Sequence, residues 1–363
     1  MASSDIGPAG ELVGGGTEAE KTAAEMSAIM ERIRSEDEES RVQAAGEIRR
    51  LTKTSSKHRR QLSDAIEPLV SLLRSGSPES GEAAILALLN LAVGDERNKI
   101  KIVEAGALQS LLQLLQSTNS SLQEYATAAV LTLSASPINK PKISASDAIP
   151  LLVKILGDGN PQAKNDAVRA LYNLSAIAEN LKVILPLQPV PSLINLLKAC
   201  KKSSRTAEKC SALLESLVTL KEGRTALTAA EGGALTVIEV LEEGSLRSRE
   251  HAVGTLLTLC ESDQYCRYRE LVLSEGVIPG LLQLTVQGTP KSQVKARVLL
   301  QLLRSSRHHG SELPEDALEG SVCNVVSKID SADHTRKAKK MLAEMVQISM
   351  EKSLRHLQQR ASM

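Results

Sequence analysis

A pattern with a period of about 42 residues runs along almost the whole chain and limits what the chain can fold into. In each unit a small residue is followed seven positions later by an apolar one. Periods of this length are typical of repeat proteins, in which each unit buries its apolar face against its neighbours. The small residues are Ala44, Ala84, Ala126, Ala167, Cys210, Ala252, Ala296 and Ala338, and their apolar partners are Leu51, Leu91, Leu133, Leu174, Leu217, Leu259, Leu303 and Met345. Eight such units account for nearly all of the 363 residues.

Each unit is predicted to contain a short, a medium and a long helix. In most of the long segments the apolar residues follow the i, i+3, i+4, i+7 spacing of an amphipathic helix. Glycine and proline separate the segments, for example at 76–78, 157–161 and 288–290. The chain has four Tyr, no Phe and no Trp, whereas large β-sandwiches and most cofactor pockets use aromatic side chains heavily. The sequence therefore predicts an all-α fold of stacked helices, an α-solenoid.

The recurring small residue marks the place where neighbouring helices are expected to cross closely. A bulky side chain at such a crossing would force strained packing at a cost of about 1–3 kcal/mol. The sequence thus predicts that this column is buried in every unit.

Charge and cysteine usage argue against several functional classes. The 44 Lys and Arg nearly balance 43 Asp and Glu, whereas nucleic-acid-binding domains usually have a pI above about 9. The five Cys form no CxxC pair and the six His show no HExxH spacing, so we expect no metal site and no cofactor. No nucleophile–base pair or phosphate-binding loop is apparent, so no catalytic residue is predicted. With neither a signal peptide nor an apolar run long enough to span a membrane, we expect the protein in the cytosol or nucleus.

Several segments match a known family in register. ALLNLA (87–92), NKIKIVEAGAL (98–108) and IPLLVKIL (149–156) resemble the armadillo repeat. QEYATAAVLTLS (123–134) and REHAVGTLLTLC (249–260) look most like the armadillo repeats of plant U-box ubiquitin ligases. The resemblance covers residues 21–346 and implies a right-handed superhelix of about eight armadillo repeats that binds proteins in its concave groove.

The segments outside the repeats carry no sign of a second folded domain. Residues 1–20 are rich in Gly, Ser, Ala and Glu and are predicted to be disordered. Residues 347–363 are predicted to form a basic helix end or tail. The sequence contains no Trp, no Phe and no Cys-Pro-Ile, which are marks of the U-box itself.

Candidate groove residues follow from two columns of the repeat. In the family, the position six after the small residue often carries Asn, which clamps a peptide backbone. The amide suits this role because it both donates and accepts hydrogen bonds. The candidates in this column are Asn90, Thr132, Asn173, Ser216 and Thr258. The position before the small residue supplies Tyr125, Asp166, Lys209, His251 and Lys295, and Arg169 stands where importin-type members place Trp.

Each candidate also has an ordinary structural interpretation. Asn90 and Asn173 could bond only to backbone groups within the repeats, and Tyr125 and His251 could be plain surface residues. The periodic acidic residues Glu82, Glu124, Glu208 and Glu250 are interpreted as salt-bridge partners between repeats rather than as catalytic groups.

The column of charges favours an acidic partner over the C-terminal half of the groove, beside Lys209 and Lys295. The amides and hydroxyls of Asn90, Thr132 and Asn173 would hold the partner's backbone farther towards the N-terminus. The predicted function is a non-enzymatic scaffold that binds extended segments of proteins, with no small-molecule substrate, no nucleic acid and no membrane span. The alternative is a substrate-binding adaptor that works with a separate ubiquitin ligase.

Overall fold

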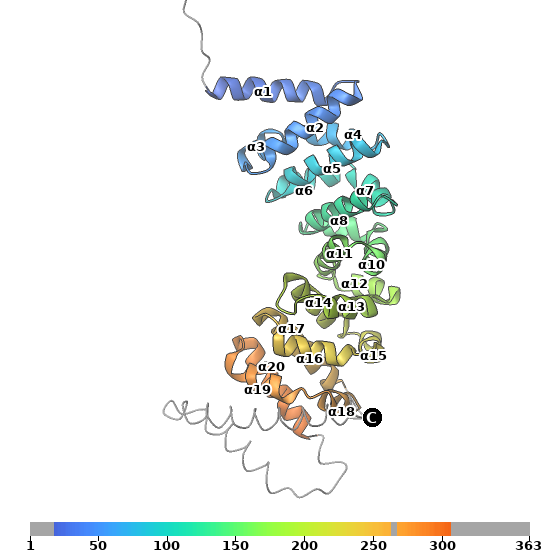
Figure 1. Ribbon diagram of the computed structural model, residues 1–363, viewed down its shortest axis with the longest axis vertical. Helices are drawn as coiled ribbons and strands as arrows, with labels where there is room; N and C mark the ends of the chain where they lie inside the picture. Colours follow the sequence, from blue (N-terminus) through green and yellow to red (C-terminus); the bar gives the residue numbers. More distant parts are fainter. Residues whose placement is uncertain (1–17, 263–266, 306–363) are drawn as a thin grey trace, which may run out of the picture. The chain divides into compact units, whose positions relative to one another are not determined.

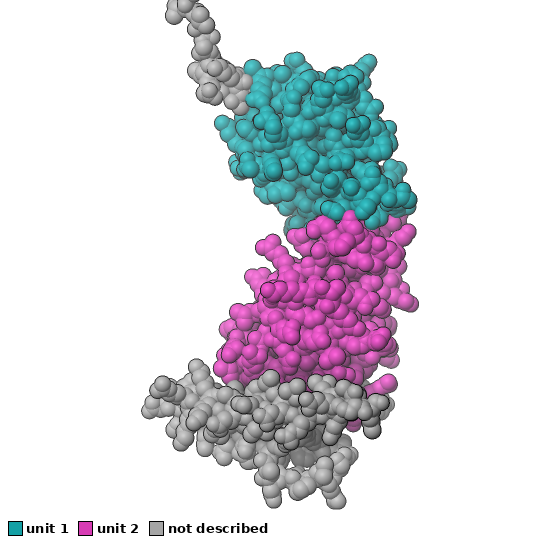
Figure 2. Space-filling model, viewed as in Figure 1, with its two compact units in different colours: residues 1–139 teal, residues 140–363 magenta. Residues whose placement is uncertain are grey.

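The structure is a computed structural model that describes residues 18–262 and 267–305 (Figure 1). All regular elements in these residues are helices, which agrees with the predicted all-α class. The chain divides into two compact units, residues 1–139 and 140–363 (Figure 2). The expected last repeat over 306–346, including Ala338 and Met345, and the basic tail over 347–363 lie outside the described residues. The count of eight repeats thus stays a prediction.

In unit 1, a helix pair precedes two three-helix repeats. The pair consists of α1 (Glu18–Ile33) and α2 (Glu38–Thr52). The first repeat contains α3 (Ser56–Gln61), a 3-10 turn (Ser63–Ala65), α4 (Ile66–Leu73) and α5 (Pro78–Ala92). The second contains α6 (Glu96–Glu104), α7 (Ala107–Leu115) and α8 (Ser120–Ser134). Helix α1 begins slightly before residue 21, the predicted start of the repeats, and residues 1–17 are outside the description.

Unit 2 contains four further repeats with the same order of helices. The first is α9 (Lys140–Ser144), α10 (Ala148–Asp158) and α11 (Pro161–Leu174). The second is α12 (Ala178–Ile184), a 3-10 turn (Leu185–Leu187), α13 (Pro189–Ala199) and α14 (Arg205–Leu217). The third is α15 (Lys221–Ala229), α16 (Gly233–Glu243) and α17 (Leu246–Glu261). The fourth is α18 (Arg267–Ser274), α19 (Ile278–Gln287) and α20 (Pro290–Ser305).

The third helix of each repeat begins at a side-chain cap. The side chains of Ser77, Asn119, Asn160, Ser204 and Ser245 each accept a hydrogen bond from a backbone N–H in the first turn of the helix that follows. A cap of this kind stabilises a helix by about 1 kcal/mol, because it satisfies one of the otherwise unpaired N–H groups. The cap residues therefore set where each third helix starts and keep successive third helices in register.

The predicted column of small residues is buried wherever the structure describes it. Ala44, Ala84, Ala126, Ala167, Cys210, Ala252 and Ala296 expose at most 1% of their surface. Successive third helices pack against each other within each unit, as the small side chains allow. The described members of the apolar partner column are also buried, except for Leu51, which is half-buried. This part of the sequence prediction is confirmed.

A buried asparagine at or just before the first helix ties three of the six described repeats to the preceding repeat. In unit 1, Asn98 Nδ2 donates to the carbonyls of Leu91 and Arg59, both at 3.0 Å. Asn139 Nδ2 donates to Lys99 O at 2.9 Å and Leu133 O at 3.3 Å. In unit 2, Asn180 Nδ2 donates to Leu174 O at 2.8 Å. Each amide satisfies carbonyls at the end of a third helix, where no N–H of the helix itself is left to pair with them.

Candidate functional site

The third helices lie side by side in each unit and carry all of the predicted site residues (Figure 1). In unit 1, α5 packs against α2 and α8; in unit 2, α14 packs against α11 and α17, and α17 packs against α20. Asn90 lies on α5, and Tyr125 and Thr132 lie on α8. In unit 2 the residues are Asp166, Arg169 and Asn173 on α11, Lys209 and Ser216 on α14, His251 and Thr258 on α17, and Lys295 on α20. All are half-buried except Asp166, which is buried.

The amide and hydroxyl column is hydrogen-bonded to backbone carbonyls. Asn90 Nδ2 donates to Arg49 O of the neighbouring helix α2 at 2.8 Å. Thr132 Oγ1 donates to Ala128 O at 2.8 Å, and Ser216 Oγ donates to Ala212 O at 3.1 Å. Asn90 thus bonds to a backbone carbonyl, as the alternative to peptide binding supposed, but the carbonyl belongs to α2 and not to its own repeat. The hydroxyl oxygens keep the capacity to accept a hydrogen bond from a partner.

Asp166 and Arg169 pair with each other on α11. Asp166 is 4% exposed, and it accepts hydrogen bonds from Gln162 Nε2 at 3.0 Å and Arg169 Nη1 at 2.9 Å. The carboxylate therefore faces its own helix, and the side chain of Arg169 is the more exposed member of the pair.

Lys209 contacts both a carboxylate and an aromatic ring. Its ammonium lies 3.3 Å from Glu208 Oε1 and 4.3 Å from the centre of the Tyr172 ring. A cation over a tyrosine face is attracted by the ring's quadrupole. The positive charge of Lys209 is thus held in place by groups of the protein itself.

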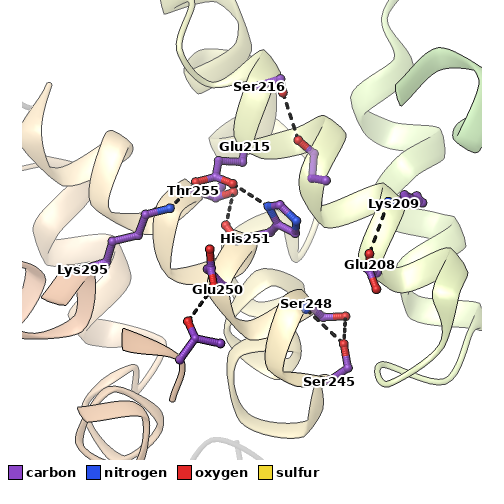
Figure 3. A network of polar contacts seen from close by, with 12 residues as sticks. Glu208, Lys209, Glu215, Ser216, Ser245, Ser248, Glu250, His251, Thr255 and Lys295 are labelled. Atoms are coloured by element: carbon purple, nitrogen blue, oxygen red, sulfur yellow. Dashed lines mark hydrogen bonds and ion pairs between the residues drawn. The ribbon is translucent and has the colours of Figure 1, made fainter. Parts of the chain in front are cut away.

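Glu215 joins three consecutive third helices of unit 2 (Figure 3). Its Oε2 lies 2.7 Å from Nδ1 of His251 on α17. Its Oε1 accepts a hydrogen bond from Lys295 Nζ on α20 at 2.6 Å. Two of the predicted residues, His251 and Lys295, therefore meet at one carboxylate that the sequence analysis did not select.

Gly254 leaves the room that this contact needs. The Glu215 side chain comes from α14 and Lys295 from α20, and Gly254 lies on α17 between those helices. A Cβ atom on Gly254 would overlap Glu215 Oε1 and would lie 2.7 Å from Lys295 Nζ. The glycine thus permits an ion pair that crosses over the middle helix.

The pKa of Glu215 reflects two opposing influences. Burial disfavours the carboxylate and raises the pKa, but the hydrogen bonds from His251 and Lys295 and the charge of Lys295 lower it. Together the contacts with His251 and Lys295 outweigh the effect of burial, so the pKa of Glu215 lies below the usual value for glutamate. Glu215 is therefore ionised at neutral pH and compensates the charge of Lys295.

A signal for Glu215 was present in the sequence. Glu215 lies five positions after the small residue, where other units carry Arg49, Leu89, Leu131, Tyr172, Leu257 and Gln301. The units on either side carry Tyr172 and Leu257 there. A charged residue between two such neighbours predicts a specific polar contact, because an unpaired buried charge would be costly. The period alone did not reveal the partners, which lie 36 and 80 residues farther along the chain.

The surface formed by the third helices presents polar and charged side chains on packed helices. Among the described residues, no group of three or more His, Cys, Asp or Glu is placed to hold a metal ion. In the same part of the chain, no helix combines the length and apolar character that crossing a membrane requires. The side chains gathered here are hydrogen-bond donors, acceptors and charges at fixed spacing.

Comparisons with known proteins agree with the sequence pattern. U-box domain-containing protein 1 of Medicago truncatula is 37% identical over 274 residues, which cover 74% of this chain and 39% of that protein. U-box domain-containing protein 45 of Arabidopsis thaliana is 36% identical over 103 residues, or 28% of this chain and 13% of that protein. The matched part of the chain thus spans well under half the length of these relatives.

The fold is also similar to that of solved repeat structures. The crystal structure of an engineered protein aligns with a TM-score of 0.68 and 23% identity, covering 88% of this chain and 76% of that one. A model of the family described as the plant U-box protein ARM repeat region matches residues 25–323. The resemblance derived from the sequence is therefore confirmed, and the chain belongs to the family of plant U-box protein ARM repeat regions.

Proposed function

We propose that the chain binds partner proteins through the surface formed by its third helices and catalyses no reaction itself. The observation that carries this proposal is the row of half-buried polar side chains on helices that pack side by side in each unit. Membership of an ARM repeat family supports it, because repeat folds of this kind present extended surfaces for binding.

The partner is proposed to lie as an extended segment along these helices. Hydroxyls such as Thr132 and Ser216 would accept hydrogen bonds from its backbone. An acidic part of the segment, proposed to lie over α14, α17 and α20, would have to compete with Glu208 for Lys209 and with Glu215 for Lys295. Charge reversal of these two lysines should therefore slow association and flatten its salt dependence.

Site-directed cross-linking tests the surface directly. A partner is first isolated by affinity purification under native conditions. A photo-reactive residue at position 258 on third helix α17 should then cross-link to it, whereas one at Lys142 on first helix α9 should not. Cross-links from Lys142 with none from position 258 would contradict the proposed surface.

A second candidate is an adaptor that presents substrates to a separate ubiquitin ligase. The observation that favours it is the family itself, since the curated relatives are named as U-box domain-containing proteins. Recovery of ligases or ubiquitin-conjugating enzymes among the partners would support this role. The purified chain should not accelerate ubiquitin transfer unless a ligase is added, and strong self-ubiquitination would refute the non-catalytic proposal.

We also propose that the protein acts in the cytosol or nucleus. Among the described cysteines, Cys200 and Cys210 are free thiols, as expected in a reducing compartment. A fluorescent fusion found in the secretory pathway would contradict this location.

A further inference from the structure

A basic depression lies between α2 and α5 of unit 1. It has a volume of about 310 Å³ and is lined by Gly46, Arg49, Arg50 and Lys53 from α2 and its C-terminal cap, and by Asn90 from α5. The three cationic residues are all exposed, and none of the described residues that line the depression is a carboxylate. Positive charge is therefore concentrated around one hollow on the surface that we propose for partner binding.

The positive charges of Arg49, Arg50 and Lys53 are not tightly paired with carboxylates of the protein. Within the described residues, the side chains of Arg49 and Lys53 have no ion-pair partner. Arg50 lies 3.2 Å from Glu25, but the two side chains are 66% and 49% exposed, so this pair is readily exchanged. In unit 2, by contrast, Arg169, Lys209 and Lys295 each contact a carboxylate.

These cations are also not required to stabilise the carbonyl groups at the C-terminal end of α2. Basic residues in a last helical turn often serve to stabilise the unpaired carbonyls there. Here Arg59 donates to Thr52 O at 2.9 Å and to Lys53 O at 3.0 Å, and Asn90 donates to Arg49 O at 2.8 Å. Because these carbonyls already have donors, the side chains of Arg49, Arg50 and Lys53 are available to a ligand.

Gly46 forms an open part of the depression. A Cβ atom placed on Gly46 meets nothing within 4 Å, so a side chain at this position would project into empty space. Gly46 is mid-helix, where glycine costs about 1 kcal/mol relative to alanine. The helix thus carries a residue that weakens it at a place where a larger side chain would occupy the hollow.

We propose that this depression binds a phosphate group carried by a serine or threonine of an extended protein segment. The inference rests on the proposed function and assigns the chemistry of one contact within it. Two guanidinium groups and an ammonium match a compact dianion, since arginine forms paired hydrogen bonds to phosphate oxygens. The Asn90 amide adds polar capacity at the rim.

The surrounding charge favours a small anion over a long polyanion. Residues 18–40 contain eight acidic and three basic side chains, and helix α1, from this segment, packs against α2. A membrane rich in anionic lipid or a nucleic acid would bring further negative charge towards this acidic segment. Repulsion, which is screened over a Debye length of about 8 Å, would oppose both. A single phosphate is small enough to contact the local cations and has only Glu25, the partner of Arg50, to displace.

The test uses a library of labelled degenerate peptides with a central phosphoserine. Two matched libraries carry serine or glutamate at that position. Binding of each library to the full chain is measured by fluorescence anisotropy. The phosphoserine library should bind at least about tenfold more tightly than either of the others. Gly46→Leu, which fills the depression without changing charge, and the double change Arg49→Ala, Lys53→Ala should each reduce affinity by about tenfold or more. Arg60→Ala, an exposed arginine of α3 outside the depression, should leave affinity unchanged and serves as the matched control.

The outcomes separate this inference from the proposed function. Equal binding of the glutamate library, or phosphopeptide binding that survives Gly46→Leu in a folded protein, would overturn the phosphate site. Stronger binding to phosphatidylserine vesicles or to RNA than to the phosphoserine library would also overturn it. A partner that still cross-links through position 258 in the Gly46→Leu variant would leave the proposed function standing, because that position belongs to unit 2.

Discussion

Replacing Gly254 by alanine tests the ion pair that crosses α17. The added Cβ would lie 2.6 Å from Cδ of Glu215 and 2.7 Å from Nζ of Lys295, which is too close for both to stay. Both atoms are at or near the ends of flexible side chains, so the helix backbone can keep its position while the side chains swing apart. The change therefore breaks the contact between Glu215 and Lys295 without altering either charged residue.

The expected magnitude combines a gain and a loss. Alanine in a helix interior is more stable than glycine by about 1 kcal/mol. A charge-assisted hydrogen bond contributes about 1.5–3 kcal/mol, and the lower end applies because solvent reaches the pair. Gly254→Ala alone should thus destabilise by about 0.5–1 kcal/mol, but in a Glu215→Ala background it should stabilise by about 1 kcal/mol. The sign of the effect changes with the residue at position 215.

Urea unfolding followed by circular dichroism measures the overall change, and hydrogen exchange of the α17 amides locates it in unit 2. Gly46→Ala is the matched control, because nothing lies within 4 Å of its added Cβ. It should stabilise by about 1 kcal/mol whatever stands at position 215. The reasoning is refuted if Gly254→Ala stabilises the protein equally in both backgrounds.

Three further predictions concern stability. Because the pKa of Glu215 is lower in the folded state, the unfolded chain binds a proton at this residue more readily. The stability that Glu215 contributes is therefore present above pH 4.5 and is lost as the pH falls through the lower pKa of the folded state. Urea midpoints measured between about pH 3 and pH 6 should fall with pH in the native chain and fall less steeply in Glu215→Gln. Asn98→Ala leaves two carbonyls without their buried donor and should lower stability by about 2 kcal/mol in thermal unfolding, whereas a change below about 0.5 kcal/mol would mean that water replaces the amide. Ala167→Leu should cost about 1–3 kcal/mol because position 167 is fully buried, while Ala83→Leu, at a half-buried position, should be nearly neutral; equal effects on the unfolding midpoint would show that the repeat register is wrong.

The repeat pattern was sufficient to predict the fold class and much of the core. Each unit repeats the same small and apolar columns, so an error in one unit would conflict with the others. This redundancy explains why the burial of Ala84, Ala126 and Ala252 could be predicted, and why every candidate site residue lies on a third helix. The buried asparagines at 98, 139 and 180 follow the same period and could have been found by the same alignment.

The contacts that each polar side chain makes could be read only from the tertiary structure. The sequence predicted Lys209 and Lys295 as groove charges for a partner, but each contacts a carboxylate of the protein itself. Asp166, also a groove candidate, is buried against Arg169. A column of the repeat specifies which helix face a residue occupies, but not which side chains from neighbouring helices reach it.

The two most specific features of the surface arise where side chains are missing. Gly254 leaves room for Glu215 to reach Lys295, and Gly46 leaves the hollow between α2 and α5 open. A sequence pattern registers a glycine as a gap in an amphipathic helix, and by itself it cannot say whether a neighbour fills that gap. The sequence by itself determined the helices and their stacking, because these depend on apolar periodicity. Only the tertiary structure decided which charges are paired and which remain available, because pairing depends on distances of a few ångströms between residues far apart in the chain.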